Sequence, residues 1–183
     1  GEHRDVTIKN DSSESRDMEL ICYFEPVLSP ERDYKAHPAF SKLTMETALN
    51  EYGIIIKRRS GARVIPVVLC FACNEKMKFD TSREQALGRG GYRAIKSVAA
   101  HDTKSSIGAV LDPCVFSKIS FTLRPGESKR VHYALAVSEE EEAAASGAQR
   151  ILKLKKLRGL SHLDNKAKFF EMLPGEVDEA MHR

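Results

Sequence analysis

Residues 118–137 read KISFTLRPGESKRVHYALAV, and this stretch decides the fold class. Apolar and polar residues alternate from Ile119 to Leu123, which is the period of a strand with one buried face. Residues 124–127, RPGE, place proline and glycine where both favour a tight turn. The alternation then resumes over residues 131–137. We therefore predict two antiparallel strands joined as a hairpin.

The same pattern recurs toward the N-terminus. Residues 4–9 and 18–24 alternate on either side of the polar cluster NDSS at 10–13, which predicts a second hairpin. Further strands are predicted at 44–49, 53–59, 64–73 and 76–80. Short strands with regular turn signals are typical of an antiparallel β-sandwich. The predicted fold class is mainly β, with residues 1–137 forming the sandwich module.

The character of the chain changes at Ser138. Ser138 and Glu141 have the spacing of a helix capping box, and acidic residues suit the start of a helix. Two helices are predicted, over residues 143–158 and 161–173, because glycine or proline follows each. Residues 138–183 are thus expected to form a helical tail that packs on the sandwich or on a partner domain.

Composition excludes some classes of function. The chain has 183 residues, with 29 basic against 26 acidic side chains and a net charge of +3. This balance is too even for a nucleic-acid-binding protein, which needs a strongly basic face. No secretory signal and no membrane-spanning apolar run is recognised in the sequence.

Cysteine spacing bears on metals, cofactors and location. Only Cys70 and Cys73 are close, and they lie in a predicted strand, where residues three apart face opposite sides. A metal site needs further ligands at comparable spacing, so neither a metal nor a cofactor is predicted. We expect four buried free thiols, which are typical of a reducing compartment. The expected location is cytoplasmic, for the chain itself or as the cytoplasmic domain of a membrane-associated parent.

The first candidate binding segment is HPAFSKL at residues 37–43, which begins in a predicted long loop at 29–41. Pro38 disfavours a helical conformation at His37. The ring of Phe40 could stack on a sugar face, and Lys42 could bond sugar hydroxyls. The alternative is a structural loop in which Phe40 plugs the core and Lys42 is solvated.

The second candidate segment is LGRGGYR at residues 87–93, in a predicted loop at 82–112. Its glycines, Gly90 among them, let the backbone approach a ligand closely, and Arg89 could bind an anion. The alternative is a flexible turn with solvated arginines. The segment lacks the pattern of a phosphate-binding loop.

Catalytic residues are not recognised. His101 and Asp102 have no serine or cysteine nucleophile beside them in the sequence. Asp80, Asp102 and Asp112 are available for glycoside chemistry, but nothing singles out a pair among them. We therefore assign no catalytic residue to the chain.

Six segments in order resemble one known module. They are DVTIKNDS at 5–12, MELICYFEPVL at 18–28, AHPAFSKL at 36–43, FDTSREQALGRG at 79–90, IGAVLDPCVFS at 107–117 and LRPGES at 123–128. Together they are similar, over roughly residues 3–142, to the carbohydrate-binding-like sandwich module of cyclic β-1,2-glucan synthases and their glycoside hydrolase family 94 relatives. Each motif is short, but six in order are specific.

The resemblance implies a large antiparallel sandwich followed by a helical linker and an (α/α)₆ barrel, which carries the catalytic acid. It implies that the sandwich packs against the barrel, shapes the substrate cleft and can take part in dimerisation. The first strands of such a module would precede Gly1. By the same analogy His37, Phe40, Lys42, Arg89 and Gly90 are the expected substrate-binding residues, facing the barrel or the cleft.

Three hypotheses about function follow. The leading one is a non-catalytic module of a β-1,2-glucan-processing phosphorylase or synthase, with a β-glucan oligosaccharide and a barrel as partners. A second is one part of an active split phosphorylase or transglycosylase. A third is a structural interaction domain that has no sugar role.

Overall fold

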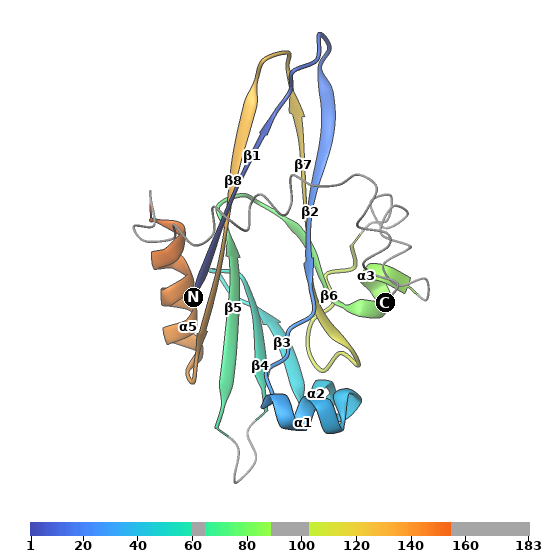
Figure 1. Cartoon of the computed structure of the whole chain (residues 1–183), viewed down its shortest axis with the longest axis vertical. Coiled ribbons are helices and arrows are strands. Elements are labelled where there is room, and N and C mark those ends of the chain that lie inside the picture. Colours follow the sequence, from blue (N-terminus) through green and yellow to red (C-terminus); the bar gives the residue numbers. More distant parts are fainter. Residues whose placement is uncertain (60–64, 89–102, 155–183) are drawn as a thin grey trace. The chain divides into compact units, whose positions relative to one another are not determined.

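Two antiparallel sheets stack face to face in the computed structural model, which describes residues 1–59, 65–88 and 103–154 (Figure 1). Sheet A has the strand order β1 (Glu2–Lys9), β8 (Ser128–Ser138), β5 (Val67–Cys73), β4 (Ile54–Arg58) and β3 (Met45–Leu49). Sheet B has the order β2 (Arg16–Phe24), β7 (Pro113–Leu123) and β6 (Lys78–Ser82). The predicted sandwich is confirmed. These strands all belong to the compact unit Gly1–Lys153; a second unit begins at Leu154.

Both predicted hairpins are wrong, although their strands lie where the alternation placed them. β1 pairs antiparallel with β8, and β2 pairs antiparallel with β7. The turns at 10–15 and 124–127 therefore lead from one sheet into the other. Alternation decides which side chains of a strand are buried. Two successive strands can bury those side chains either by pairing edge to edge in one sheet or by stacking face to face in two sheets. The spacing of apolar residues along the sequence is the same in both cases, so it does not distinguish them.

Asn10 ties these two turns together. It is 2% exposed. Its backbone N–H donates to the carbonyl oxygen of Glu127 at 2.9 Å, and its own carbonyl accepts from the N–H of Gly126 at 2.8 Å. Its Nδ2 donates to the carbonyl oxygens of Leu123 at 2.8 Å and Glu14 at 2.7 Å. One residue thus satisfies backbone groups in both turns, which these turns cannot satisfy through a sheet ladder.

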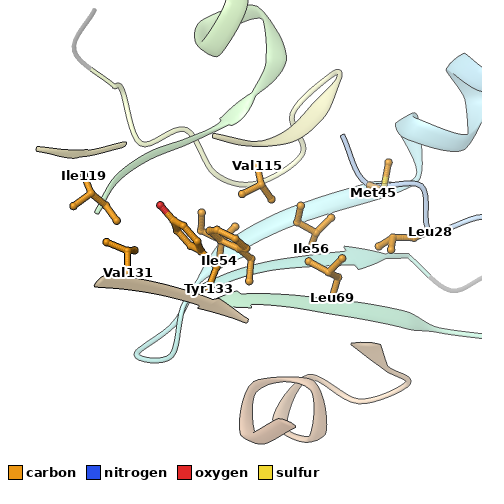
Figure 2. Packing of buried hydrophobic residues seen from close by; sticks show 10 residues of the cluster. Leu28, Met45, Ile54, Ile56, Leu69, Val115, Ile119, Val131 and Tyr133 are labelled. Atoms are coloured by element: carbon orange, nitrogen blue, oxygen red, sulfur yellow. The ribbon is translucent and has the colours of Figure 1, made fainter. Parts of the chain in front are cut away.

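The main core lies between the sheets, and Figure 2 shows Ile54, Ile56 and Tyr133 pointing into it. The rings of Phe71 and Tyr133 stack with their centroids 5.5 Å apart. Phe24, at the end of β2, meets Phe71 edge-on at 5.6 Å. Burying one such side chain contributes roughly 1.5–3 kcal/mol, so this cluster is a major source of stability.

Short helices occur in segments that were predicted as long loops. α1 (Glu31–Ala36) and α2 (Pro38–Leu43) follow β2, and α3 (Arg83–Leu87) follows β6. Five or six residues make fewer than two helical turns, which is too short for an apolar period to be visible in the sequence. His37, at φ −144° and ψ 74°, separates α1 from α2, and Pro38 starts α2. The predicted effect of Pro38 on His37 is confirmed.

α5 (Glu141–Leu152) packs on the outer face of sheet A. Ala144, Ala145 and Ala148 are buried there against small side chains of β5 and β8. Alanine keeps this interface thin, and a Cβ on Gly147 would lie 3.2 Å from that of Ala136. The first part of the predicted tail is therefore part of the same unit as the sandwich.

The predicted capping box is wrong. Ser138 is still the last residue of β8, paired with Val68, so the N-cap is Glu140 and no side chain caps the helix. Glu141 instead forms an ion pair with Lys57 at 2.7 Å. α5 ends at Leu152, short of the predicted residue 158. The second predicted helix, 161–173, lies outside the described residues.

The cysteines are free thiols, as predicted. Cys70 and Cys114 are buried, as predicted, whereas Cys22 and Cys73 are half-buried, so the predicted burial is wrong for these two. Cys70 packs toward α5 and Cys73 toward the core between the sheets, so the two face opposite sides of β5, as predicted. Burial raises the pKa of the Cys70 and Cys73 thiols to about 11, and each therefore stays protonated at neutral pH.

Replacing Asn10 with alanine is expected to lower the free energy of unfolding by about 2–3 kcal/mol, because buried carbonyl oxygens lose their donors. Urea denaturation followed by circular dichroism measures the change. Ser12→Ala is the control, since the Ser12 hydroxyl bonds the Asn10 side chain but lies nearer the surface, and it should cost less than about 1 kcal/mol. Equal costs for the two variants would contradict the role given to Asn10.

Candidate functional site

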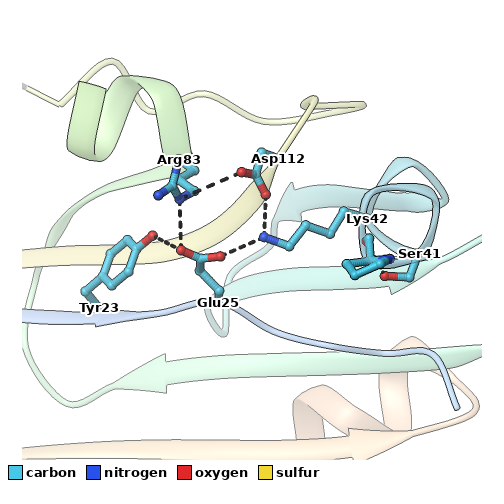
Figure 3. A network of polar contacts seen from close by, with 7 residues as sticks. Tyr23, Glu25, Ser41, Lys42, Arg83 and Asp112 are labelled. Atoms are coloured by element: carbon cyan, nitrogen blue, oxygen red, sulfur yellow. Dashed lines mark hydrogen bonds and ion pairs between the residues drawn. The ribbon is translucent and has the colours of Figure 1, made fainter. Parts of the chain in front are cut away.

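A cluster of four charged side chains and a tyrosine lies beside the end of β2 (Figure 3). Lys42 Nζ donates to Glu25 Oε2 and to Asp112 Oδ1, each at 2.7 Å. Arg83 Nε donates to Glu25 Oε1 at 2.9 Å, and the Tyr23 hydroxyl donates to the same oxygen at 2.8 Å. These five residues are called the Glu25 cluster below.

Each charged member of the Glu25 cluster comes from a different segment. Glu25 follows β2, Lys42 lies near the end of α2, Arg83 begins α3, and Asp112 precedes β7. A backbone bond from the Arg83 N–H to the Asp112 carbonyl oxygen, 2.9 Å, joins the last two directly. The cluster therefore fixes α2 and the start of α3 against the end of sheet B.

The electrostatics of the cluster suit a structural clamp. Burial alone raises the pKa of Glu25, but the hydrogen bonds from Lys42, Tyr23 and Arg83 outweigh it and lower that pKa to about 2. Burial lowers the pKa of Lys42, but its hydrogen bonds to Asp112 and Glu25 outweigh this effect, so the pKa is raised above its ordinary value. At neutral pH both groups are charged. A general acid needs a pKa near the working pH, so neither group is tuned for that role.

The predicted binding residues of HPAFSKL differ in their exposure: Lys42 is largely buried, whereas His37 and Phe40 are exposed. Lys42 is held in the Glu25 cluster with its side chain 16% exposed, so it is not solvated. Phe40 is 69% exposed, so it does not plug the core, and its ring meets that of exposed His37 edge-on at 5.8 Å. The other two predicted residues, Arg89 and Gly90, lie outside the described residues.

Exposed apolar side chains gather on the elements that the cluster holds. α2 carries Phe40 and Leu43, which is 43% exposed, and the segment before β7 carries Ile107 and Leu111, 55% and 75% exposed. The Lys42–Asp112 ion pair and the bridge from Thr47 to Gly108 hold this segment next to α2 and β3. Phe40, Leu43, Ile107 and Leu111 are called the α2 surface below.

Asp80, one of the carboxylates considered above, is 1% exposed. It accepts hydrogen bonds from the backbone N–H groups of Ser82 at 2.9 Å and Lys104 at 3.1 Å. It thereby anchors the segment that leads to the α2 surface, which is a structural role. His101 and Asp102 lie outside the described residues.

Sequence reasoning missed Glu25 and Tyr23. The signal that could have found Glu25 is its position in MELICYFEPVL, one of the segments that carry the family resemblance. Four of those segments each contribute one charged residue to the cluster. Two acidic and two basic side chains, one from each of four separate motifs, would have suggested ion pairing between those motifs.

Residues 1–59, 65–88 and 103–154 contain no group of three or more histidine, cysteine, aspartate or glutamate side chains placed to hold a metal ion. Among the same residues, no helix has the length and apolar character needed to cross a membrane.

The stacked antiparallel sheets define a β-sandwich module, and a family match places this sandwich more closely. Residues 1–153 match the family described as "Glycosyl hydrolase 94, supersandwich domain", and the chain belongs to that family. One curated relative is the cyclic beta-(1,2)-glucan synthase NdvB of Rhizobium meliloti (strain 1021). It is 32% identical over 127 residues, which cover 62% of this chain and 4% of the relative.

The pKa of Glu25 predicts a dependence of stability on acid. Because about 2 lies below the ordinary value of 4.5, the folded state favours the carboxylate. The resulting stabilisation is complete above pH 4.5 and is lost as the pH falls toward 2. In Glu25→Gln the free energy of unfolding should fall less steeply over this interval.

The measurement is urea denaturation at a series of pH values. Glu31→Gln is the matched control, because Glu31 lies in an exposed ion pair with Lys35. It should retain the pH dependence of the native chain. An identical slope in Glu25→Gln and the native chain would show that the cluster does not hold Glu25 ionised.

Proposed function

We propose that this chain is the non-catalytic sandwich module of a β-glucan-processing enzyme, and that it packs against an (α/α)₆ catalytic barrel through the α2 surface. The main support for this proposal is the α2 surface. The Glu25 cluster, whose four charges sum to zero, holds exposed apolar side chains in place, and no described residue covers them. Family membership and the name of the glucan synthase relative support the connection to β-1,2-glucan. The free thiols fit a cytoplasmic location.

The chemistry of the α2 surface favours docking to another protein. Two of its side chains are more than three-fifths exposed, Phe40 at 69% and Leu111 at 75%. Large apolar groups held in fixed positions are typical of an interface core, where aromatic anchors carry much of the binding energy. The Glu25 cluster removes the need to order α2 on binding, which lowers the entropic cost of association.

Docking is tested with a separately produced (α/α)₆ barrel of a family 94 enzyme, measured by surface plasmon resonance. The native chain should bind, and Phe40→Ser and Leu111→Ser should each bind at least about tenfold more weakly. Tyr52→Ser is the control, because Tyr52 is an exposed aromatic residue in the turn between β3 and β4. No binding by the native chain, or equal loss in all three variants, would refute the docking surface.

The same assembly separates the split-enzyme hypothesis from a scaffold. Phosphorolysis or transglycosylation that requires both chains would support a split enzyme.

Sedimentation velocity of the chain alone, without the barrel, measures the dimer that the family resemblance implies.

A direct sugar contact is the second candidate function, and one observation favours it. Phe40 presents an exposed ring with His37 edge-on beside it, an arrangement that offers a stacking face and a hydrogen-bonding nitrogen. Isothermal titration with β-1,2-glucooligosaccharides should then give heat that Phe40→Ala abolishes and Tyr52→Ala preserves. Absence of heat at millimolar oligosaccharide would assign the α2 surface to docking alone.

A further inference from the structure

An apolar groove of about 620 Å³ opens onto the inner side of sheet A, and its described lining includes no member of the Glu25 cluster. One wall is the chain from Phe24 to Pro30, which leaves sheet B at the end of β2. The floor includes Val67 and Leu69 of β5 and Leu135 and Val137 of β8. These side chains lie on the face of each strand that, farther along the strand, packs into the core between the sheets.

Part of this inner face is uncovered. Val137 is 58% exposed and Ile65 is 65% exposed at the rim, and Val27 in the wall is 42% exposed. Residues 26–29 continue from β2 outside any sheet. The groove therefore combines a partly exposed apolar floor with one wall whose backbone belongs to no sheet.

A cation with an unused donor lies in the groove. Arg58, at the end of β4, is 9% exposed, and its Nη2 donates to the Ile65 carbonyl oxygen at 2.8 Å. Its Nε is buried and has no hydrogen-bond partner within the described ranges, and the same holds for Ser29 Oγ in the opposite wall. A buried donor left unsatisfied costs about 1–3 kcal/mol, more when the group is charged.

The charges lining the groove favour an anionic occupant. The lining contains two arginines, Arg4 and Arg58, and one carboxylate, Glu2. Glu2 is already paired with Arg4, so Arg58 is the cation without a carboxylate in the described part of the groove. A carboxylate against Arg58 would neutralise the charge of its guanidinium group and accept hydrogen bonds from it, in the fork geometry that arginine offers.

We propose that this groove binds an extended acidic peptide segment. Its glutamate or aspartate side chain pairs with Arg58, and its apolar side chains at alternate positions cover the floor at Leu69 and Leu135. Its backbone runs beside residues 26–29, which form part of one wall of the groove. A saccharide fits less well, because Phe24 is the one aromatic residue among the described lining residues and most of the others are aliphatic.

The probes are two fluorescein-labelled heptapeptides, TVTETVT and TVTQTVT, which place valine, glutamate or glutamine, and valine on one face of a strand. Fluorescence anisotropy measures the binding of each to the native chain. The glutamate peptide should bind at least about tenfold more tightly than the glutamine peptide. Equal binding, or no binding of the glutamate peptide at about millimolar concentration, overturns the proposal.

Variants of Arg58 assign the preference to its guanidinium. Arg58→Met should bind both peptides equally, and Arg58→Lys, which keeps the charge, should retain a reduced preference for glutamate. Arg16→Met is the control, since Arg16 is exposed at the start of β2, and it should keep the native preference. Circular dichroism confirms folding, and if Arg58→Met does not fold, the Arg58→Lys result decides.

Two other occupants are outcomes of the same experiment. Sodium decanoate carries a carboxylate on an apolar chain; if it binds through Arg58 and the peptides do not, the occupant is an amphiphile and the peptide proposal is wrong. If the native chain self-associates in sedimentation velocity and Arg58→Met does not, the occupant is a second copy, which also overturns the proposal. These results are independent of docking at the α2 surface.

Discussion

The passage of the chain between two sheets, rather than along one, is the constraint on which the rest of the structure depends. One turn connects β1 to β2 and another connects β7 to β8, each passing from one sheet to the other. Asn10 holds the two turns together through hydrogen bonds to four backbone groups. Because of this crossing, the apolar faces of successive strands point at each other, and the core around Phe71 and Tyr133 closes between them. Sheet pairing then follows between strands distant in sequence.

The far end of the sandwich is organised by charge. Glu25 leaves β2 with a partly buried carboxylate, which needs donors and positive charge to remain ionised there. Lys42 and Arg83 supply the hydrogen-bond donors and the positive charge. Because Lys42 lies in α2 and Arg83 in α3, their bonds to Glu25 also hold these two helices in place. Asp112 completes the neutrality and places the segment before β7 beside α2. In this chain, four of the motif segments are therefore joined by one cluster, because each contributes a charged member to it.

The two surfaces proposed for binding differ in how they arise. The α2 surface is apolar side chains held outward by a satisfied ionic cluster. The groove at Arg58 is a stretch of inner sheet face left open, with a cation whose Nε lacks an acceptor in the described part of the chain. Docking at the α2 surface would need no further charge compensation, whereas the occupant proposed for the groove brings an anionic group to Arg58.

The sequence by itself determined the strands, their buried faces, the opposite orientation of Cys70 and Cys73, and the family, because alternation and ordered motifs are local properties. Only the tertiary structure decided that the predicted hairpins cross between sheets, that Ser138 stays in β8, and that Lys42 is clamped while Phe40 is exposed. Pairing and ion-pair partners are choices among segments far apart in the chain. Their free energies depend on which segments meet in space, and spacing along the sequence does not contain that information.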